Sequence, residues 1–285
     1  MSRVAYVKGR YLPLAQAGVS ILDRAFVFGD GVYEVCLARD GALIDEARHL
    51  ARVRSSLAAL RIAAPVGEGA LRRILREVVA RNRVSNGLVY LQISRGVARR
   101  DHGFPPPGVT PGLVVTAKSL DPRLGEAIAE CGVAVITLPE ERWAHPHVKS
   151  LQLLPNVLAK QAAREAGAYE AWFVDRDGFV TEGASTNAWI VAADGALATR
   201  QADQAILRGV TRTTLLDIVV AEDLRFEERP FTREEAYGAR EAFLSSATTI
   251  ATPVVALDGR PIGDGRPGPI TTTLRRKFAA VAARS

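Results

Sequence analysis

The pattern of hydrophobic and polar residues predicts helices and strands in the first half of the chain. Apolar residues recur at steps of three and four in two stretches, the first with Leu50, Val53, Leu57 and Leu60 and the second with Leu71, Ile74, Leu75, Val78 and Val79. This spacing places the side chains on one face of an α-helix, so each stretch predicts a helix with a buried face. Alternating or β-branched runs predict a hairpin over 4–11 and strands over 31–39, 88–94 and 113–117.

The second half shows a similar mixture after a break in the pattern. Residues 155–166 are expected to form a helix, because Pro155 stands in its first turn and Gly167 follows its end. Strands are expected over 171–174 and 187–191, and a helix over 211–222. Turn-forming residues over 118–123 predict a linker between an N-terminal α/β domain, 1–117, and a second domain, 124–285. A length of 285 residues fits two domains, and the fold class predicted is α+β.

Composition and charge exclude several classes of protein. The net charge is +6, but the basic residues are spread along the chain among 31 acidic ones, which argues against a nucleic-acid partner. No apolar run approaches the roughly 20 residues that a membrane helix needs, and residues 1–14 contain no signal-peptide core. The two cysteines, Cys36 and Cys131, suggest neither a disulfide framework nor a metal site. We therefore expect a cytoplasmic protein with no metal, no membrane and no nucleic acid.

One lysine stands in a context that suggests chemistry. Of five lysines, only Lys149 lies in an apolar stretch crowded with turn-forming residues, 145–151. Such surroundings favour the uncharged amine, which can attack a carbonyl carbon. The alternative is a surface lysine whose stem packs on the neighbouring leucines, and local context alone favours it.

The longer segment 148–161, VKSLQLLPNVLAKQ, resembles the lysine segment of fold type IV enzymes that use pyridoxal 5′-phosphate (PLP). It is most similar to that of the D-amino-acid transaminases, and the resemblance extends over nearly the whole chain. It implies a two-domain α+β fold with the active site at the domain interface. It also implies that Lys149 binds PLP as a Schiff base and then carries the proton between the substrate carbon and the cofactor.

Four further segments resemble the family's cofactor-binding motifs. In the segment 181–187, TEGASTN, Glu182 would contact the pyridine nitrogen and keep it protonated. The phosphate would be bound by Val210 and Thr211 at a helix N-terminus, by Arg52, and by Thr248 in the segment 245–249, SSATT. Relatives commonly have threonine where this chain has Ala247. From the residues alone, Glu182 could be a turn residue, Thr211 a helix cap, and Arg54 the phosphate ligand in place of Arg52.

Two segments resemble the family's substrate-binding motifs. Tyr33, in the segment 28–34, FGDGVYE, matches a tyrosine of the substrate pocket, although a tyrosine on a strand is more often a core residue. In the charged loop 95–102, Arg100 and His102 match the pair that binds the substrate α-carboxylate in D-amino-acid transaminases. The alternative is a solvated loop. In the family this loop serves the neighbouring subunit's active site, which implies a homodimer.

The resemblance implies a transaminase with small-molecule substrates, an amino acid and a 2-oxo acid. A D-amino acid such as D-alanine or D-glutamate would give up its amino group, and a 2-oxo acid would accept it, in a ping-pong cycle between the PLP and pyridoxamine phosphate forms. The alternatives on the same fold are a branched-chain L-amino-acid aminotransferase, an R-selective amine aminotransferase and an aminodeoxychorismate lyase. Outside enzymes, the chain could be a PLP carrier or a basic two-domain interaction protein.

Overall fold

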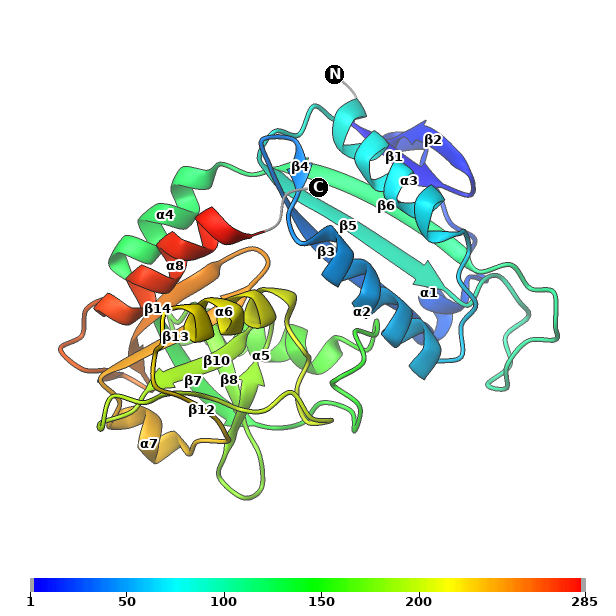
Figure 1. Ribbon diagram of the computed structural model, residues 1–285. Coiled ribbons are helices and arrows are strands. Elements are labelled where there is room, and N and C mark those ends of the chain that lie inside the picture. Colours follow the sequence, from blue (N-terminus) through cyan, green and yellow to red (C-terminus); the bar gives the residue numbers. More distant parts are fainter. Residues whose placement is uncertain (1–2, 283–285) are drawn as a thin grey trace. The chain divides into compact units, whose positions relative to one another are not determined.

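The computed structural model describes residues 3–282, which form two compact units (Figure 1). Unit 1 contains the residues up to 122 together with Val148–Gln152, and unit 2 contains Arg123–His147 and Leu153–Ala282. Each unit has a sheet of its own and a hydrophobic core of its own. The predicted α+β class with two units is therefore confirmed.

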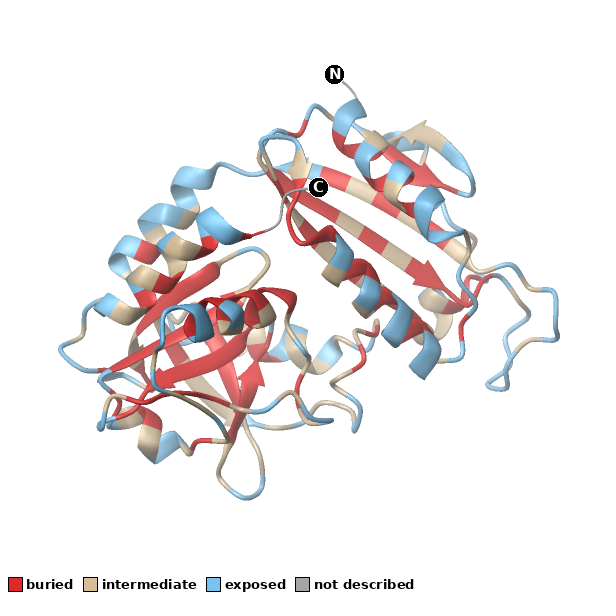
Figure 2. Cartoon of the chain, in the orientation of Figure 1, coloured by how far each residue is buried: buried red, intermediate tan, exposed pale blue. Residues whose placement is uncertain are grey.

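Unit 1 is built on an antiparallel sheet. Within its described residues the sheet has six strands in the order β2-β1-β6-β5-β3-β4. Their bounds are Val4–Val7 (β1), Arg10–Pro13 (β2), Gly31–Arg39 (β3), Ala42–Leu43 (β4), Gly87–Ser94 (β5) and Gly112–Ser119 (β6). Buried and half-buried residues alternate along β5 and β6 (Figure 2), as expected when one face of a sheet is covered.

Two long helices cover that face of the unit 1 sheet (Figure 1). They are α2, Glu46–Ala59, and α3, Glu68–Arg81, and the apolar faces predicted for them are buried against the strands. The outward faces of both helices are exposed (Figure 2). Unit 1 also contains a 3₁₀ turn, Leu14–Gln16, and the short helix α1, Arg24–Phe28, whose N-terminus is capped by the side chain of Asp23.

Unit 2 is built on a mixed sheet. Within its described residues the strand order is β12-β11-β10-β13-β14-β7-β8-β9, and β15 pairs with β14. The strands are Val133–Pro139 (β7), Glu170–Val174 (β8), Val180–Gly183 (β9), Asn187–Val191 (β10), Leu197–Thr199 (β11), Phe226–Glu228 (β12), Glu241–Ser246 (β13), Ile250–Leu257 (β14) and Arg260–Pro261 (β15). All residues of β9, β10 and β11 are buried, so both faces of this sheet are covered.

Five helices belong to the described part of unit 2: Pro122–Cys131 (α4), Leu154–Glu165 (α5), Val210–Ala221 (α6), Arg233–Tyr237 (α7) and Pro269–Val281 (α8). Large aromatic residues fill its interior. Trp189 stacks on Phe243 with ring centroids 5.2 Å apart, and Trp172 meets Phe231 edge to face. Among residues 3–282, no helix combines the length and the apolar character needed to cross a bilayer.

The division of the chain differs from the predicted one in two respects. Residues 118–123 are not a free linker, because β6 continues to Ser119 and α4 begins at Pro122. Residues 148–152, predicted within the second domain, pack with unit 1 instead. The physical reason is a contact with the unit 1 sheet, since this segment forms an antiparallel bridge with β3 between Ser150 and Val32. The ends of the predicted domains, 1–2 and 283–285, lie outside the described residues.

Candidate active site

Lys149 is held beside Tyr33 by backbone pairing with β3. The Tyr33 N–H donates to the Lys149 carbonyl at 3.0 Å, and the Leu151 N–H donates to the Gly31 carbonyl at 3.1 Å. The Lys149 N–H also donates to the Ser56 hydroxyl on α2. As a result the Lys149 Nζ lies 4.3 Å from the centroid of the Tyr33 ring. The structure thus brings together two residues that the sequence singled out 116 positions apart.

The aromatic ring of Tyr33 has a second tyrosine beside it. It stacks on Tyr90 with centroids 5.9 Å apart, and the Tyr90 hydroxyl donates to the Gln92 side-chain oxygen at 2.7 Å. Burial, followed by the neighbouring Tyr33, raises the pKa of Tyr90 to about 12. Tyr90 therefore stays a neutral hydrogen-bond donor at physiological pH.

Arg52 is fixed by a buried carboxylate of the segment 28–34. Its Nε and one terminal nitrogen donate to the two oxygens of Glu34 at 2.9 and 2.6 Å, and His49 contacts the same carboxylate at 3.1 Å. Burial raises the pKa of Glu34, but Arg52 and then His49 outweigh it, so the pKa lies well below its usual value. Arg54, the rival candidate, pairs with Glu68 on the exposed side of α2. Arg52 is thus held at a buried carboxylate, whereas Arg54 faces solvent, and the assignment of Arg52 to the phosphate stays a prediction.

Arg100 and His102 meet on a single aromatic ring. The guanidinium carbon of Arg100 lies 5.3 Å from the centroid of Phe28, and the His102 ring lies at the same centroid distance, tilted by 45°. Both side chains are exposed, and the loop that carries them contains no helix or strand, as predicted. The pair is therefore available to bind an anionic group from outside unit 1.

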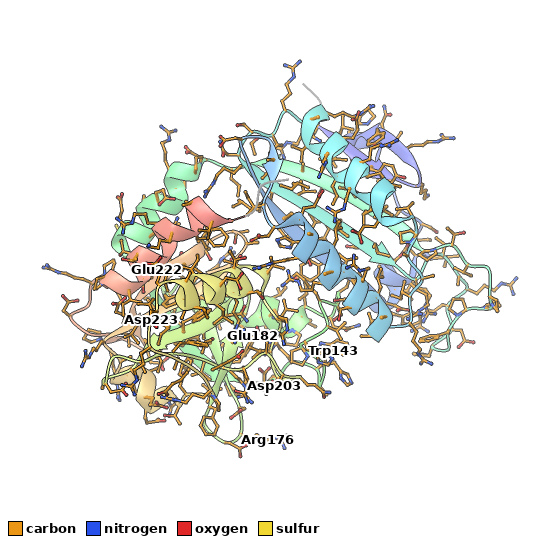
Figure 3. The ribbon with its side chains drawn as sticks, viewed as in Figure 1. Trp143, Arg176, Glu182, Asp203, Glu222 and Asp223 are labelled. Carbon is orange, nitrogen blue, oxygen red and sulfur yellow. The ribbon has the colours of Figure 1, made fainter. Side chains whose placement is uncertain are left out.

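Glu182, which is labelled in Figure 3, lies on β9 in unit 2. It is the centre of a buried polar cluster. Its Oε1 accepts from the Leu207 N–H at 3.0 Å and from Arg142, and its Oε2 accepts from the Asn187 amide at 2.9 Å. Complete burial raises the pKa of Glu182, and Arg142 and the Leu207 N–H oppose that rise. A residue with three internal donors is not the solvated turn glutamate that was the alternative.

Arg142 links Glu182 to a second carboxylate. Its Nε and a terminal nitrogen donate to Glu140 at 2.9 and 2.6 Å, while its other terminal nitrogen contacts Glu182. The guanidinium packs over the Phe173 ring at 4.8 Å. No local motif pointed to Arg142, which lies in the loop after β7, because its partner Glu182 lies 40 residues away on β9. Asn187 belongs to the segment 181–187, but the sequence did not suggest a role for it.

Val210 and Thr211 form the first turn of α6, where helix geometry leaves backbone N–H groups without intrahelical partners. The residue before them, Gly209, is the N-cap, and no side chain caps this helix. The alternative in which Thr211 is the cap is therefore wrong. A Cβ atom at position 209 would collide with the Asn187 Oδ1, so glycine is needed for this close approach.

The segment 245–249 contains the end of β13 and the turn that leads to β14. The hydroxyl of Ser246 accepts from the N–H groups of Thr248 and Thr249 and contacts both of their hydroxyls at 2.9–3.0 Å. Thr248 is exposed, and its hydroxyl is held by Ser246 rather than by a core residue. Ser246, to which the sequence interpretation gave no role, thus organises the turn that carries Thr248.

Comparison with known proteins gives a consistent result. The model of the family described as amino-transferase class IV matches residues 31–257. The D-alanine aminotransferase of Staphylococcus haemolyticus is 38% identical over 273 residues, which are 96% of this chain and 95% of that protein. The D-alanine aminotransferase of Bacillus licheniformis is 39% identical over 267 residues, 94% and 93% of the two chains.

Among solved structures, a branched-chain amino acid aminotransferase from T.th. with pyridoxamine 5′-phosphate superimposes with a TM-score of 0.89 and 27% identity. The match covers 98% of this chain and 93% of that one. The family match spans β3 to β14 and includes Lys149, Glu182 and both segments singled out for phosphate binding at 210–211 and 245–249. The chain therefore belongs to the class IV aminotransferases.

Proposed function

We propose that this protein is a PLP-dependent transaminase that takes the amino group of a D-amino acid and passes it to a 2-oxo acid. The observation that carries the proposal is the relationship to D-alanine aminotransferases over almost the whole chain. The position of Arg100 and His102 on one ring supports the same conclusion, because a guanidinium and an imidazole side by side suit a carboxylate.

Taken separately, each of the two units contains residues that suit chemical groups of PLP. Lys149 supplies the amine, and in unit 2 the Oε2 of Glu182 has accepted one hydrogen bond and retains a lone pair for a pyridine N–H. The uncapped first turn of α6 offers backbone N–H groups, which together with Arg52 suit a phosphate. Thr248 would add a hydroxyl donor. When bound, PLP supplies an electron sink that makes the substrate Cα–H bond acidic.

The chain's own residues then divide the work. The Lys149 amine, which lies beside the Tyr33 ring, would take the proton from the substrate carbon and pass it to the cofactor. In the second half of the cycle the same amine would carry a proton in the reverse direction. Glu182 remains an acceptor because Arg142 offsets part of the cost of burying its charge. Arg100 and His102 orient the substrate through its carboxylate, and Tyr33 would line the substrate pocket.

We also propose a homodimer in the cytoplasm. Unit 1 exposes an apolar surface that includes Val19, Ile21, Phe26 and Val97, and Ile21 and Phe26 are 77% and 72% exposed. Three of these four side chains line a cavity of about 690 Å³. An apolar surface of this kind favours association with another protein surface, and a second copy of the chain is the simplest one. The two cysteines are free, in keeping with a reducing compartment.

The half-reaction tests the proposal directly. The PLP-loaded enzyme is mixed with D-alanine or with L-leucine, and the visible absorbance of the bound cofactor is followed. Rapid loss with D-alanine alone supports a D-amino-acid donor. Loss with L-leucine alone would move the protein to the branched-chain class, which the T.th. structure represents. No loss with either would favour an amine donor or a lyase.

Two substitutions test the assigned residues. Lys149→Ala should abolish turnover, because no other residue is assigned to bind the cofactor covalently and move the proton. Arg100→Ala should raise KM for D-alanine about 10- to 100-fold, the equivalent of one charged hydrogen bond. Arg99→Ala removes the same charge from the adjacent position of the loop and is the matched control. An unchanged KM in Arg100→Ala would remove Arg100 from the substrate site.

A further inference from the structure

The Phe28 ring is surrounded by three groups from two separate segments. The Arg24 guanidinium carbon lies 4.8 Å from its centroid, the Arg100 guanidinium carbon 5.3 Å, and the His102 ring 5.3 Å. Arg24 and Phe28 are the two ends of α1, whereas Arg100 and His102 lie in the loop more than 70 residues later. Attraction between cations and the faces of an aromatic ring stabilises this arrangement.

We propose that Phe28 and Arg24 are positioning residues that hold the Arg100/His102 loop in the conformation that binds the substrate carboxylate. This inference rests on the proposed function, because it assumes that Arg100 and His102 contact substrate. Neither Phe28 nor Arg24 was assigned a role from the sequence, and both act through the loop rather than by touching substrate themselves.

Arg24 also holds the backbone of the loop between the two proposed ligands. One of its terminal nitrogens donates to the carbonyl of Asp101 at 2.7 Å, and its Nε donates to the carboxylate of Asp30 at 2.7 Å. Arg24 is only 4% exposed, so its geometry is fixed by these partners. The backbone carbonyl of Asp101, between Arg100 and His102, therefore accepts a hydrogen bond from a buried guanidinium whose charge is balanced by Asp30.

Asp30 connects Arg24 to Arg95, the residue at which the loop begins. It accepts two hydrogen bonds from Arg95, at 2.8 and 2.9 Å, in addition to the one from Arg24. Desolvation raises the pKa of Asp30, but the hydrogen bonds from Arg95 and then Arg24 outweigh it and lower the pKa. Asp30 is therefore ionised at neutral pH and offsets the charges of both arginines.

The far part of the loop has an aromatic anchor of its own. Phe104 lies under the Arg95 guanidinium at 3.8 Å and near that of Arg61 at 4.7 Å. Arg95 in turn donates to the carbonyls of Leu60 and Arg61 at the end of α2. The loop is thus held at Arg95 before the Arg100/His102 pair, at Phe28 beside the pair, and at Phe104 after it.

Such anchoring matters because the loop contains no regular secondary structure. Two exposed side chains on an unanchored loop would lose conformational entropy each time they bound a carboxylate. A loop already held by Arg24 and Phe28 loses less, so substrate binds more tightly. Loss of the anchors should therefore raise KM more than it lowers kcat.

The kinetic test compares Phe28→Leu with Phe28→Tyr in the PLP-loaded enzyme. Phe28→Leu removes the ring and should raise KM for D-alanine about threefold to tenfold, whereas Phe28→Tyr keeps the ring and should restore the wild-type value. In a background of Arg100→Ala and His102→Ala, Phe28→Leu should cause no further rise. A KM unchanged by Phe28→Leu, or an equal rise in that background, would overturn the inference.

A second test measures how fast a protease cleaves the loop, and it does not depend on enzyme activity. Trypsin cleaves after Arg99 and Arg100, and Arg24→Met should accelerate cleavage at these sites in the PLP-loaded enzyme while a matched substitution on the exposed side of α2, Arg54→Met, should not. Equal cleavage rates in both variants would also overturn the inference. The half-reaction of the wild-type enzyme with D-alanine separates the two failures. If D-alanine does not discharge the cofactor absorbance, the proposed function fails, whereas if it does and the Phe28 and Arg24 variants behave as wild type, only the inference fails.

Discussion

Replacement of Arg142 by methionine should destabilise unit 2 in a pH-dependent way. Methionine keeps much of the volume but leaves Glu182 buried without its cation. Losing one partner of a buried ion pair costs about 3–5 kcal/mol. The variant can avoid part of this cost by protonating Glu182, whose ordinary pKa is 4.5. That neutralisation costs about 1.36 kcal/mol for each pH unit above the ordinary value.

The destabilisation should therefore be small at low pH and large at high pH. At pH 5.5 protonation of Glu182 limits the loss to about 1.4 kcal/mol, and at pH 8 the loss should reach about 3–5 kcal/mol. Loss of the Arg142–Glu140 pair adds to the destabilisation at both pH values. In the wild type, burial raises the pKa of Glu140, but Arg142 outweighs it and the net pKa is lowered. The resulting stability is present above pH 4.5 and is lost in the variant.

Tryptophan fluorescence reports on the affected unit, because Trp143, Trp172 and Trp189 all belong to unit 2. Urea unfolding of wild type and variant, without added cofactor, is followed at pH 5.5 and at pH 8. Arg54→Met removes an exposed arginine of unit 1 and should give the same small difference at both values. A loss for Arg142→Met that does not grow with pH would refute the electrostatic reasoning.

Two further substitutions test close packing and the Arg52 anchor. Gly209→Ala should destabilise the protein by about 1–3 kcal/mol and weaken PLP binding, because the added methyl group collides with Asn187. Gly69→Ala, at an open helical position, is the control and should stabilise the protein by about 0.5–1 kcal/mol. Thermal unfolding and PLP titration measure both variants, and equal effects of the two substitutions would contradict the collision. Glu34→Gln should raise the dissociation constant for PLP, since Arg52 loses its charged anchor, and unchanged PLP affinity would show that Arg52 needs no such support.

The sequence predicted those parts of the fold that depend on local pattern. The buried faces of α2 and α3 follow from apolar residues three and four positions apart, and the helix predicted over 155–166 is observed as Leu154–Glu165. The elements after residue 222 were not predicted. There β13 and β14 are almost wholly buried, so they lack the alternation that identifies a strand with one exposed face.

The residues of the candidate site also fall into two groups. Some stand in a local sequence motif, and others are recognised only by contacts with residues far away in the sequence. Lys149 and Glu182 stand in continuous motifs, so the sequence alone suggests them as candidates. Arg142, Arg24 and Phe28 carry no such local signal, because their contacts are with residues that only folding brings near. The assignment of residues 148–152 to the second domain failed for a related reason, since pairing with β3 depends on a contact more than 100 positions away.

That pairing has a consequence for the order in which the chain folds during synthesis. A nascent chain that ends at residue 122 has every strand of the unit 1 sheet, but Gly31 and Tyr33 still lack the hydrogen-bond partners supplied by Lys149 and Leu151. Domains emerging from the ribosome generally fold as units, N-terminal ones first. Here the edge of the first sheet is completed only after part of the second unit has been made. The lysine to which we assign catalysis is therefore also the residue whose arrival completes that edge.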